Sequence, residues 1–510
     1  LLVVVALLMM TATRAARIPE AGAVVAAVLA AVGLLMKLTL GIAALSIVAM
    51  GALGLWTRAD ERGRRAALAA VAAGLLVVFV LSGQLFDTRT DFYAWVTASI
   101  EAVVGFGSAM SLSAHASVLV CGIIAGGAAF GVVFFLKRRE QAVLQAGVML
   151  GLALLLSFRD GLVRQDIRIT HFFPFAIAVL AVFVLVARQP TSSRVLVISV
   201  LVAIFAALSS YTAIGILHPA EAARTALGVR GTENLRALAL IEETRADLHR
   251  ESESNLALMR LPDRWITGIR QQGGTIDAFP GEISYAPANE LSWDPNPVLQ
   301  AHIAYTAALD LKSAEQYGPI NAPAFVIAEY KSLDTRHPLL DAPATARELL
   351  RNYTLEDGDR EPERLLLRHV GARFPAVLTP THSETRDFDE WIDVPRSDRL
   401  LFAELDLKLT TRGQWTATVF RVPPIMIDVV YGNGRNETYR IVPATARNGL
   451  LLNYLPPTLD DLAGLFLGSA TSRVEKFRVG GSGAALHESR FVVTWREADY
   501  RVGGTRIASN

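Results

Sequence analysis

The side chains best suited to chemistry lie in one polar segment between two apolar runs, Phe158 to His171. The segment holds three arginines, two aspartates and a histidine, namely Arg159, Asp160, Arg164, Asp166, Arg168 and His171. The planar fork of an arginine fits phosphate oxygens, so the three arginines together predict binding of a lipid pyrophosphate. A carboxylate or an imidazole can take the proton of an attacking hydroxyl, which makes Asp160, Asp166 and His171 candidate bases.

The same composition has a simpler interpretation. Arginine and aspartate on a solvated loop often pair with one another without any further role. Charge at membrane depth is costly, however, and tends to mark a functional site. From the sequence alone both interpretations stay open.

A second group of polar residues lies near the ends of two expected strands further along the chain. Asp277 falls in the run Thr275 to Phe279, and Asp334 follows the run Ala324 to Tyr330. Ligands of α/β units bind beyond strand ends, so both aspartates are candidate substrate-binding residues if the two strands are neighbours. The alternative is that such acids cap helices and close turns.

Several classes of function have no support in the sequence. The motifs of P-loop and dinucleotide-binding proteins and of the common hydrolases are absent. A formal charge of +1 argues against a nucleic-acid-binding surface. The one cysteine, Cys121, excludes an intramolecular disulfide and a cysteine metal cage. No spacing of histidines or acidic residues predicts a metal site, and the cofactor stays unknown, with a divalent metal as an open alternative.

Membrane helices must position the polar segment. A helix needs about 20 mainly apolar residues to cross the hydrocarbon core. Up to Leu217 the chain has apolar runs near 21–36, 38–56, 67–83, 115–136, 142–158, 172–187 and 195–217. Residues 1–217 are therefore expected to form a transmembrane helical domain. The run Leu1 to Thr13 is too short to span and is interpreted as the remnant of a helix whose upstream part is missing.

The distribution of arginine and lysine predicts the orientation. Alternate loops are basic, with Arg14, Arg17, Arg58, Arg62, Arg64, Arg65, Lys137, Arg138, Arg139, Arg188 and Arg194. The opposite loops hold only Arg89 and the arginines of the polar segment, besides Lys37. The positive-inside rule places the basic loops in the cytoplasm, so residues 219–510 are expected outside a bacterial cytoplasmic membrane that the chain crosses several times.

Two further features belong to the membrane half. Lys37 interrupts an apolar stretch, so it either marks the turn between two spans or faces a polar cavity. A turn is the expected choice, since a lysine near a helix end can extend to the interface. In the loop Gly83 to Ala114, the stretch Phe92 to Val104 has apolar residues at helical spacing. It is expected to form an amphipathic helix at the membrane interface, with Tyr93 and Trp95 at headgroup level.

The outer part divides into three regions. Residues 218–273 have a helical pattern and form a connector. Residues 274–399 alternate short strands with helical stretches at Pro297 to Leu311 and Ala342 to Tyr353, as a mixed α/β module does. Residues 400–510 are expected to form a β-sandwich. Its strands are expected at Leu401 to Leu409, Trp415 to Arg421, Ile425 to Tyr431, Glu437 to Val442, Arg473 to Val479 and Arg490 to Trp495.

This organisation resembles the GT-C class of polyprenyl-phosphate-dependent glycosyltransferases, which combine many membrane helices, polar outer loops and a C-terminal outer domain. The resemblance is one of architecture over the whole chain, and no motif carries it. In that class the first outer loop carries the catalytic acid, commonly within a pair of acidic residues. No residue of this chain is matched to that loop.

The segment Arg159 to His171 also looks like the arginine-bearing outer loops of O-antigen polymerases and ligases. Those enzymes likewise use undecaprenyl-pyrophosphate sugars, but they usually lack so large a C-terminal outer domain. They are therefore the alternative enzyme class.

The resemblance implies a sugar donor on a polyprenyl phosphate and a glycan or lipid acceptor. Arg164 and Arg168 would bind the phosphate with Arg159 nearby, Asp166 or Asp160 would act as base, and His171 would orient the reactants. The sandwich would hold the acceptor glycan. A non-enzymatic alternative also stays open, in which the membrane half anchors a domain that recognises a glycan or a partner.

Overall fold

The computed structural model describes residues 5, 9, 19–57, 61–112, 115–136, 141–186, 190–215, 229–320, 322–360, 363–470 and 472–503. The chain divides into two compact units. Unit 1 comprises Leu1–Val103 and Leu112–Glu233, and unit 2 comprises Val104–Ser111 and Asn234–Asn510. A short segment from within the membrane half of the sequence therefore belongs to the C-terminal unit.

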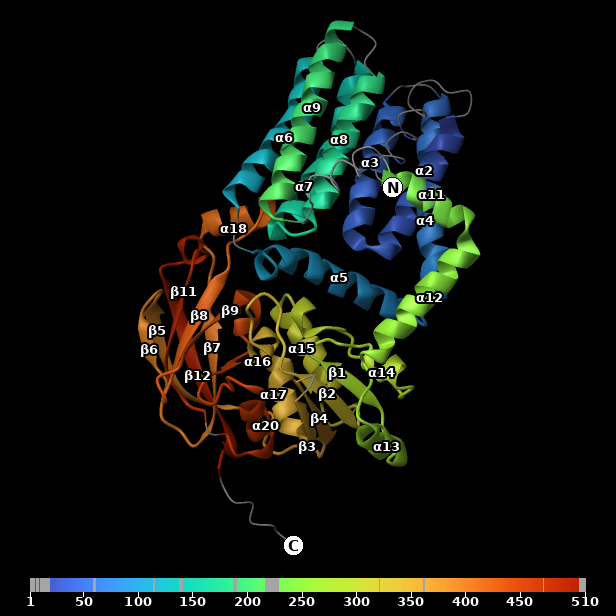
Figure 1. Ribbon diagram of the computed structural model, residues 1–510. Coiled ribbons are helices and arrows are strands. Elements are labelled where there is room, and N and C mark those ends of the chain that lie inside the picture. Colours follow the sequence, from blue (N-terminus) through green and yellow to red (C-terminus); the bar gives the residue numbers. More distant parts are fainter. Residues whose placement is uncertain are drawn as a thin grey trace. The chain divides into compact units, whose positions relative to one another are not determined.

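The described parts of unit 1 are helices joined by short connections (Figure 1). Its long helices are α2 (Pro19–Met36), α3 (Leu38–Trp56), α4 (Glu61–Leu85), most of α5 (Arg89–Ala109), α6 (Ala116–Leu136), α7 (Gln141–Arg164), α8 (Ile169–Val186) and α9 (Pro190–Ala213). Each apolar run that the sequence marked as a span overlaps one of these helices. Helix α11 (Val229–Ala239) passes from unit 1 into unit 2.

Among the described residues, three helices are long and apolar enough to cross a membrane: Leu38–Trp56, Glu61–Leu85 and Arg194–Ala213. These helices indicate that the chain is a membrane protein. Shorter apolar helices occupy Ala21–Met36, Ala116–Val132 and Ile169–Val182. The basic residues Arg14, Arg17, Arg58, Lys137, Arg138, Arg139 and Arg188, and most of Leu1 to Thr13, lie outside the described residues.

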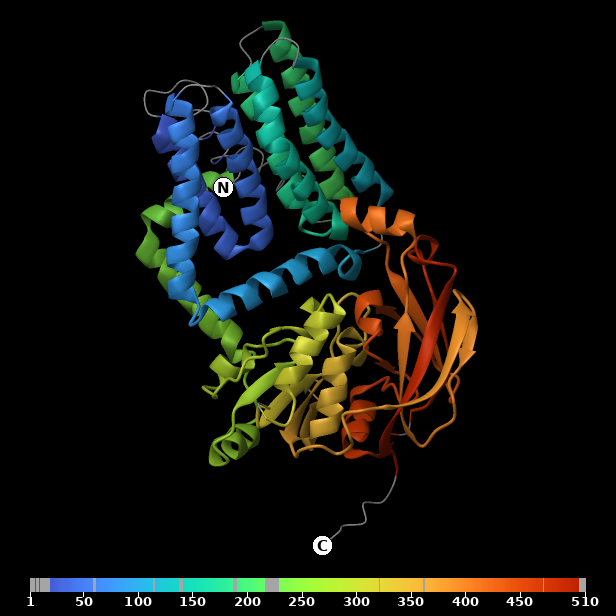
Figure 2. The ribbon, with the colours of Figure 1, turned by 180° about the vertical axis from the view of Figure 1, so that it is seen from behind.

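The helices of unit 1 pack through small residues. Helix α2 lies against α3 and α4, while α6 to α9 lie against one another, and α3 packs on α7 to join the two groups (Figure 2). Buried positions of α3 include Gly41, Ala43 and Ala44, which let neighbouring backbones approach closely. Gly41 is the extreme case, because a Cβ atom there would lie 2.0 Å from the Cα atom of Leu34. The close approach of α2 and α3 therefore depends on glycine at this position.

Helix α5 contains the stretch Phe92 to Val104, which the sequence predicted to be helical. The aromatic rings of Phe86, Phe92 and Trp95 pack together near its start. Its last turn belongs to unit 2, where the carbonyl of Ala109 accepts hydrogen bonds from both Arg336 and Arg440. Two buried guanidinium groups thus satisfy the end of a helix, where unpaired carbonyls carry partial negative charge.

Unit 2 begins with helices and a small mixed sheet. The helices are α12 (Ile241–Ala257), α13 (Asp263–Gln271), α14 (Tyr285–Ala288), α15 (Ala307–Gln316), α16 (Pro338–Asp341) and α17 (Pro343–Asn352). The strands are β1 (Ile276–Phe279), β2 (Phe325–Glu329), β3 (Tyr353–Arg360) and β4 (Glu363–His369), in the order β1-β2-β4-β3. Strands β1 and β2 are parallel and the other pairs antiparallel. The mixed α/β character of this region is as the sequence predicted.

Two four-stranded antiparallel sheets follow. One has the order β10-β7-β12-β5 and the other β6-β11-β8-β9. Their strands are β5 (Thr379–Asp387), β6 (Trp391–Asp393), β7 (Arg399–Asp406), β8 (Ile425–Tyr431), β9 (Asn436–Ile441), β10 (Leu450–Leu451), β11 (Val474–Gly480) and β12 (Arg490–Arg501). Helices α18 (Thr411–Val419), α19 (Pro443–Ala446) and α20 (Leu459–Leu467) connect them.

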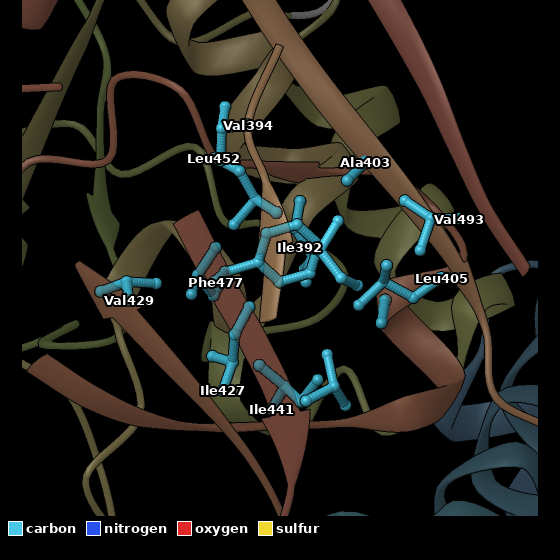
Figure 3. Packing of buried hydrophobic residues seen from close by; sticks show 14 of the residues in the cluster. Ile392, Val394, Ala403, Leu405, Ile427, Val429, Ile441, Leu452, Phe477 and Val493 are labelled. Atoms are coloured by element: carbon cyan, nitrogen blue, oxygen red, sulfur yellow. The ribbon is translucent and has the colours of Figure 1, made fainter. Parts of the chain in front are cut away.

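Both sheets contribute side chains to one hydrophobic core (Figure 3). Leu405 and Val493 come from the first sheet, and Ile427, Val429 and Phe477 from the second. The core forms because alternate residues of a strand point to the same face of its sheet. Strand β8 shows this most clearly, since its residues alternate between buried and partly buried along its length. Burial of these apolar side chains holds the β-rich region together.

Three sequence predictions about unit 2 were wrong in detail. Trp415 to Arg421, expected as a strand, lies mainly in helix α18, whose first turn is capped by the side chain of Thr410. The β-rich region begins at Thr379 rather than at residue 400, because β5 is polar and mostly exposed and shows no apolar alternation. Pro297 to Leu311 contains a short 3-10 helix (η1, Ala301–Ile303) and the start of α15 in place of one helix.

Candidate functional site

A cavity of about 320 Å³ opens among helices α3, α7 and α8 of unit 1. Its lining is largely apolar, but it includes the ionisable side chains of Lys37, Asp160 and His171. The remaining lining residues are Thr39, Leu40, Ala43, Ala153, Leu156, Ser157 and Phe175. An apolar wall beside three ionisable groups suits an amphiphilic ligand.

Asp160 and His171 meet because α7 and α8 pack closely where they are joined. Helix α7 carries Asp160 near its end, and α8 carries His171 in its first turn. Gly161 makes the approach possible, since a Cβ atom at this position would lie 2.8 Å from the Cβ atom of Phe172. The Nδ1 atom of His171 consequently lies 3.2 Å from Oδ2 of Asp160.

Lys37 joins this pair from the turn between α2 and α3. Its backbone is extended, with φ of −155° and ψ of 114°, and it separates the two helices by a single residue. The break between two helices at Lys37 agrees with the expected turn, and Lys37 also lines a cavity, which was the alternative expectation. The sequence did not indicate that its ammonium group would lie 4.0 Å from Oδ1 of Asp160. The only signal was a lysine inside an apolar stretch.

Asp160 therefore has a cationic or basic group on each carboxylate oxygen. Its side chain is 28% exposed, while those of Lys37 and His171 are more than half exposed. Exposed pairs of this kind contribute little to stability in water. The arrangement is better suited to binding an anion at Lys37 and to moving a proton through Asp160 and His171.

The arginine-rich part of the predicted site forms a separate cluster. Arg164 donates from Nε to Asp166 Oδ2 over 2.6 Å, and Asp166 Oδ1 accepts the backbone N–H of Arg168 over 3.0 Å. Burial alone would raise the pKa of Asp166, but hydrogen bonds from Arg164 and Arg168 outweigh it and the pKa is lowered. Asp166 is thus held as an anion and closes the loop between α7 and α8.

The three arginines predicted to bind phosphate do not line the cavity. Its lining includes Asp160 and His171 but none of Arg159, Arg164 and Arg168. The structure therefore divides the predicted segment into a cavity-lining pair and a paired loop. The interpretation as a functional site fits Asp160 and His171. The interpretation as charges that simply pair with one another fits Arg164 and Asp166.

The two candidate residues of unit 2 have different neighbours. Asp277 is buried on β1 and accepts hydrogen bonds from the hydroxyl of Tyr317 over 2.8 Å and from the indole of Trp293 over 3.3 Å. Burial raises the pKa of Asp277 to about 6, although these hydrogen bonds oppose the shift. A buried carboxyl held in this way is suited to a structural role.

Asp334 lies in the loop after β2, with a positive φ of 56°. Its Oδ2 atom is 3.6 Å from Nη1 of Arg440, whose side chain is buried. Strands β1 and β2 are neighbours, as the sequence hypothesis required, yet the contacts of the two aspartates do not bring them together. The prediction that they share a ligand therefore has no support from their geometry.

Within the described residues, no group of three or more histidine, cysteine, aspartate or glutamate side chains is placed to hold a metal ion. Comparison of the chain with protein-family models, with curated proteins and with solved structures found no match.

Proposed function

We propose that this protein is an integral membrane glycosyltransferase of the bacterial cell envelope. It would transfer a sugar from a polyprenyl-phosphate donor to a glycan or lipid acceptor at the outer face of the cytoplasmic membrane. The observation that carries the proposal is the cavity in which Lys37, Asp160 and His171 adjoin an apolar wall. A polyprenyl phosphate has the matching chemistry, with an anionic head and a hydrocarbon chain.

Each part of the cavity has a role in this reaction. The apolar residues, such as Leu40, Leu156 and Phe175, would lie along the first isoprene units. The ammonium of Lys37 would bind the phosphate. Arg164 and Asp166 would keep the loop between α7 and α8 in shape rather than contact the donor, because they are already paired.

The chemical step needs a base but no covalent intermediate. The acceptor hydroxyl attacks the anomeric carbon, the bond from that carbon to the phosphate oxygen breaks, and the phosphate leaves with the electron pair. The hydroxyl proton passes to Asp160, whose orientation is fixed by His171 at 3.2 Å. A polyprenyl phosphate is a good leaving group, so positioning supplies much of the catalysis.

Contacts within unit 2 support an arrangement with the C-terminal region on the same side of the membrane as the loop before α6. Ala109 accepts from Arg336 and Arg440, and Ser111 donates its hydroxyl hydrogen to the carbonyl of Val422. A loop between two spans cannot make these contacts across a bilayer. The two β-sheets, taken as a sandwich over their common core, would then be available to an acceptor glycan on that side.

The first test is donor binding. A short polyprenyl phosphate is titrated into the full-length protein in detergent, and the melting temperature is followed for the wild type and for Lys37→Gln. We expect the wild type to be stabilised and Lys37→Gln to lose most of that stabilisation. Arg65→Gln is the matched control, because it removes a positive charge from an exposed side chain of α4 that, among the residues the structure describes, pairs only with Glu61 in the same helix.

The outcomes separate the proposal from its non-enzymatic alternative. Stabilisation lost in Lys37→Gln and kept in Arg65→Gln supports a lipid-phosphate enzyme. A folded wild-type protein that polyprenyl phosphate does not stabilise contradicts the proposal and favours an anchored recognition protein.

A further inference from the structure

Unit 2 has a cavity of its own where two parallel strands end. Strand β1 is followed by Pro280, Gly281 and Glu282, and β2 ends at Glu329 and is followed closely by Lys331. Because parallel strands end at the same edge of a sheet, these residues are brought together, and they line a cavity of about 170 Å³. The edge beyond the carboxyl ends of parallel strands is where α/β folds commonly bind ligands.

Backbone hydrogen bonds hold one wall of this cavity in place. The amide of Ala301 donates to the carbonyl of Pro280 over 2.6 Å, and the side chain of Gln300 donates to the carbonyl of Gly281 over 3.1 Å. The segment after these residues carries His302 into the lining. The wall is thus fixed by the fold and independent of any ligand.

Two carboxylates of the cavity have acceptor capacity left over. Oε1 of Glu282 accepts the amide of Ser284 over 3.1 Å, and Oε1 of Glu329 accepts the hydroxyl of Tyr285 over 2.5 Å. In the part of the chain that the structure describes, the other oxygen of each carboxylate makes no hydrogen bond to protein. Oriented acceptors that keep lone pairs free can receive hydrogen bonds from ligand hydroxyl or ammonium groups.

The rest of the lining narrows the class of ligand. Lys331 and Ser332 are exposed at the cavity and add donors, while Pro280 and Leu333 supply only small apolar surfaces. A lipid chain would need a longer apolar wall, and a phosphate would meet two carboxylates. A ligand with many hydroxyl groups and no negative charge satisfies the mixture of carboxylate acceptors with amide, hydroxyl and ammonium donors.

We propose that the cavity formed by Glu282, His302, Glu329 and Lys331 at the ends of β1 and β2 binds a neutral or amino-substituted saccharide. Its role as the acceptor site rests on the proposed glycosyltransferase function, whereas saccharide binding itself does not. The site is distinct from the predicted pair Asp277 and Asp334, neither of which lines the cavity.

The test uses the full-length protein in detergent on an array of defined neutral, amino-substituted and acidic saccharides. The saccharide bound best is then titrated against purified variants by calorimetry. Glu282→Gln keeps an oxygen for the Ser284 amide but removes the charge, and we expect affinity to fall about tenfold or more. Ser332→Trp places a large ring at an exposed position of the lining and should block entry without disturbing the core.

Glu315→Gln provides the control, since it makes the same change at an exposed carboxylate of α15 that pairs with Lys312. Binding that falls in Glu282→Gln and Ser332→Trp but not in Glu315→Gln supports the inference. It is overturned if the wild type binds no saccharide, if it prefers acidic ones, or if both cavity variants bind normally. Binding that a chelator abolishes also overturns it, because the carboxylates would then hold a cation.

The polyprenyl phosphate titration on the same preparation keeps the two proposals apart. Lipid binding without saccharide binding contradicts only the present inference. Saccharide binding without lipid binding upholds this site and contradicts the proposed transferase.

Discussion

The ammonium group of Lys37, the residue between α2 and α3, lies 4.0 Å from Oδ1 of Asp160 in α7, although the two residues are far apart in the sequence. Asp160 also contacts His171, so three neighbouring ionisable groups line a largely apolar cavity. An exposed ion pair of this length adds little to folding free energy. Charged groups within a membrane domain are costly to keep, so their convergence here favours a role in binding and proton transfer.

Replacing Asp160 by asparagine should separate chemistry from binding. We expect transfer from a radiolabelled polyprenyl-phosphate sugar to fall by about 10²- to 10⁴-fold, because the variant has no base for the acceptor hydroxyl. Binding of polyprenyl phosphate should change by no more than about threefold, since the lysine is retained. Single-turnover transfer and the donor titration measure the two effects.

Asp247→Asn is a suitable control for this experiment, because Asp247 lies exposed on α12 and its one ion pair within the described ranges is with Arg250. Transfer at the wild-type rate by Asp160→Asn would remove Asp160 from the mechanism. The transfer rate of His171→Asn should lie between those of the wild type and Asp160→Asn, as expected for a residue that orients the base.

Asp166→Asn should affect stability rather than donor binding. The pKa of Asp166 is lowered in the folded chain, since the hydrogen bonds from Arg164 and Arg168 outweigh burial. The contribution of this carboxylate is therefore present above its ordinary pKa and is lost as the pH falls through that value and the lowered one. We expect the wild type to lose its stability advantage over Asp166→Asn below about pH 4.

Melting temperatures of the two proteins between pH 3 and pH 7 measure this difference. Polyprenyl phosphate binding at pH 7 should be the same in both. A variant that is as stable as the wild type but binds no donor would mean that Asp166 and Arg164 take part in donor binding.

The contacts that build the candidate site could be predicted only in part. Asp160 and His171 are joined by one short loop, so their proximity follows from the expected helix pair. The contribution of Lys37 depends on α3 packing against α7, and one sequence of small and apolar residues does not specify which helices pack together. Residue types alone did not determine whether Arg164 and Asp166 pair with each other or bind a ligand, because that depends on the positions of their side chains.

The fold was predictable where one face of an element is buried. Strand β8 has the expected bounds because its alternation reflects burial on one side. Trp415 to Arg421 was expected as a strand because Trp415 and the neighbouring threonines favour strands. In the structure Trp415 is 68% exposed, and the hydrogen bond from Gly413 to the side chain of Thr410 caps helix α18 instead. The segment 104–111 gave no signal of joining unit 2, since its contacts lie far along the chain.

Asp277→Asn should change the pH dependence of unit 2. Burial raises the pKa of Asp277 from its ordinary 3.8 to about 6. Between these values the unfolded chain ionises while the folded chain stays protonated, so wild-type stability falls as the pH rises from about 4 to 6. The variant lacks this loss and should gain up to about 3 kcal/mol on the wild type over that interval.

Hydrogen exchange of β1 amides in both proteins, from pH 4 to pH 7, measures this difference locally. Burial lowers the pKa of His337 to about 4, so His337 makes the stability of the folded chain rise with pH, opposite to the effect of Asp277. Both proteins contain His337, so comparing them at each pH cancels its contribution. If the stability difference between the variant and the wild type is the same from pH 4 to pH 7, Asp277 is ionised in the folded chain at all these pH values.

Arg336 should hold the end of α5 within unit 2. Its Nη1 atom donates to Asp341 over 2.6 Å, and its Nη2 atom donates to the carbonyl of Ala109. Both members of the ion pair are buried, and removing one partner of such a pair costs about 3–5 kcal/mol because the other charge is left uncompensated. Arg336→Met should therefore destabilise unit 2 by about this amount.

The double variant Arg336→Met/Asp341→Leu is the informative companion, since it removes both charges and should recover much of that stability. Even so, residue 336 of the double variant cannot donate to the carbonyl of Ala109, which keeps, of its two described donors, the one from Arg440. Hydrogen exchange at Met110, whose amide bonds to the carbonyl of Phe106, should be faster in both variants than in the wild type. Unchanged exchange there, together with lowered stability, would mean that the ion pair stabilises unit 2 without fixing the helix end.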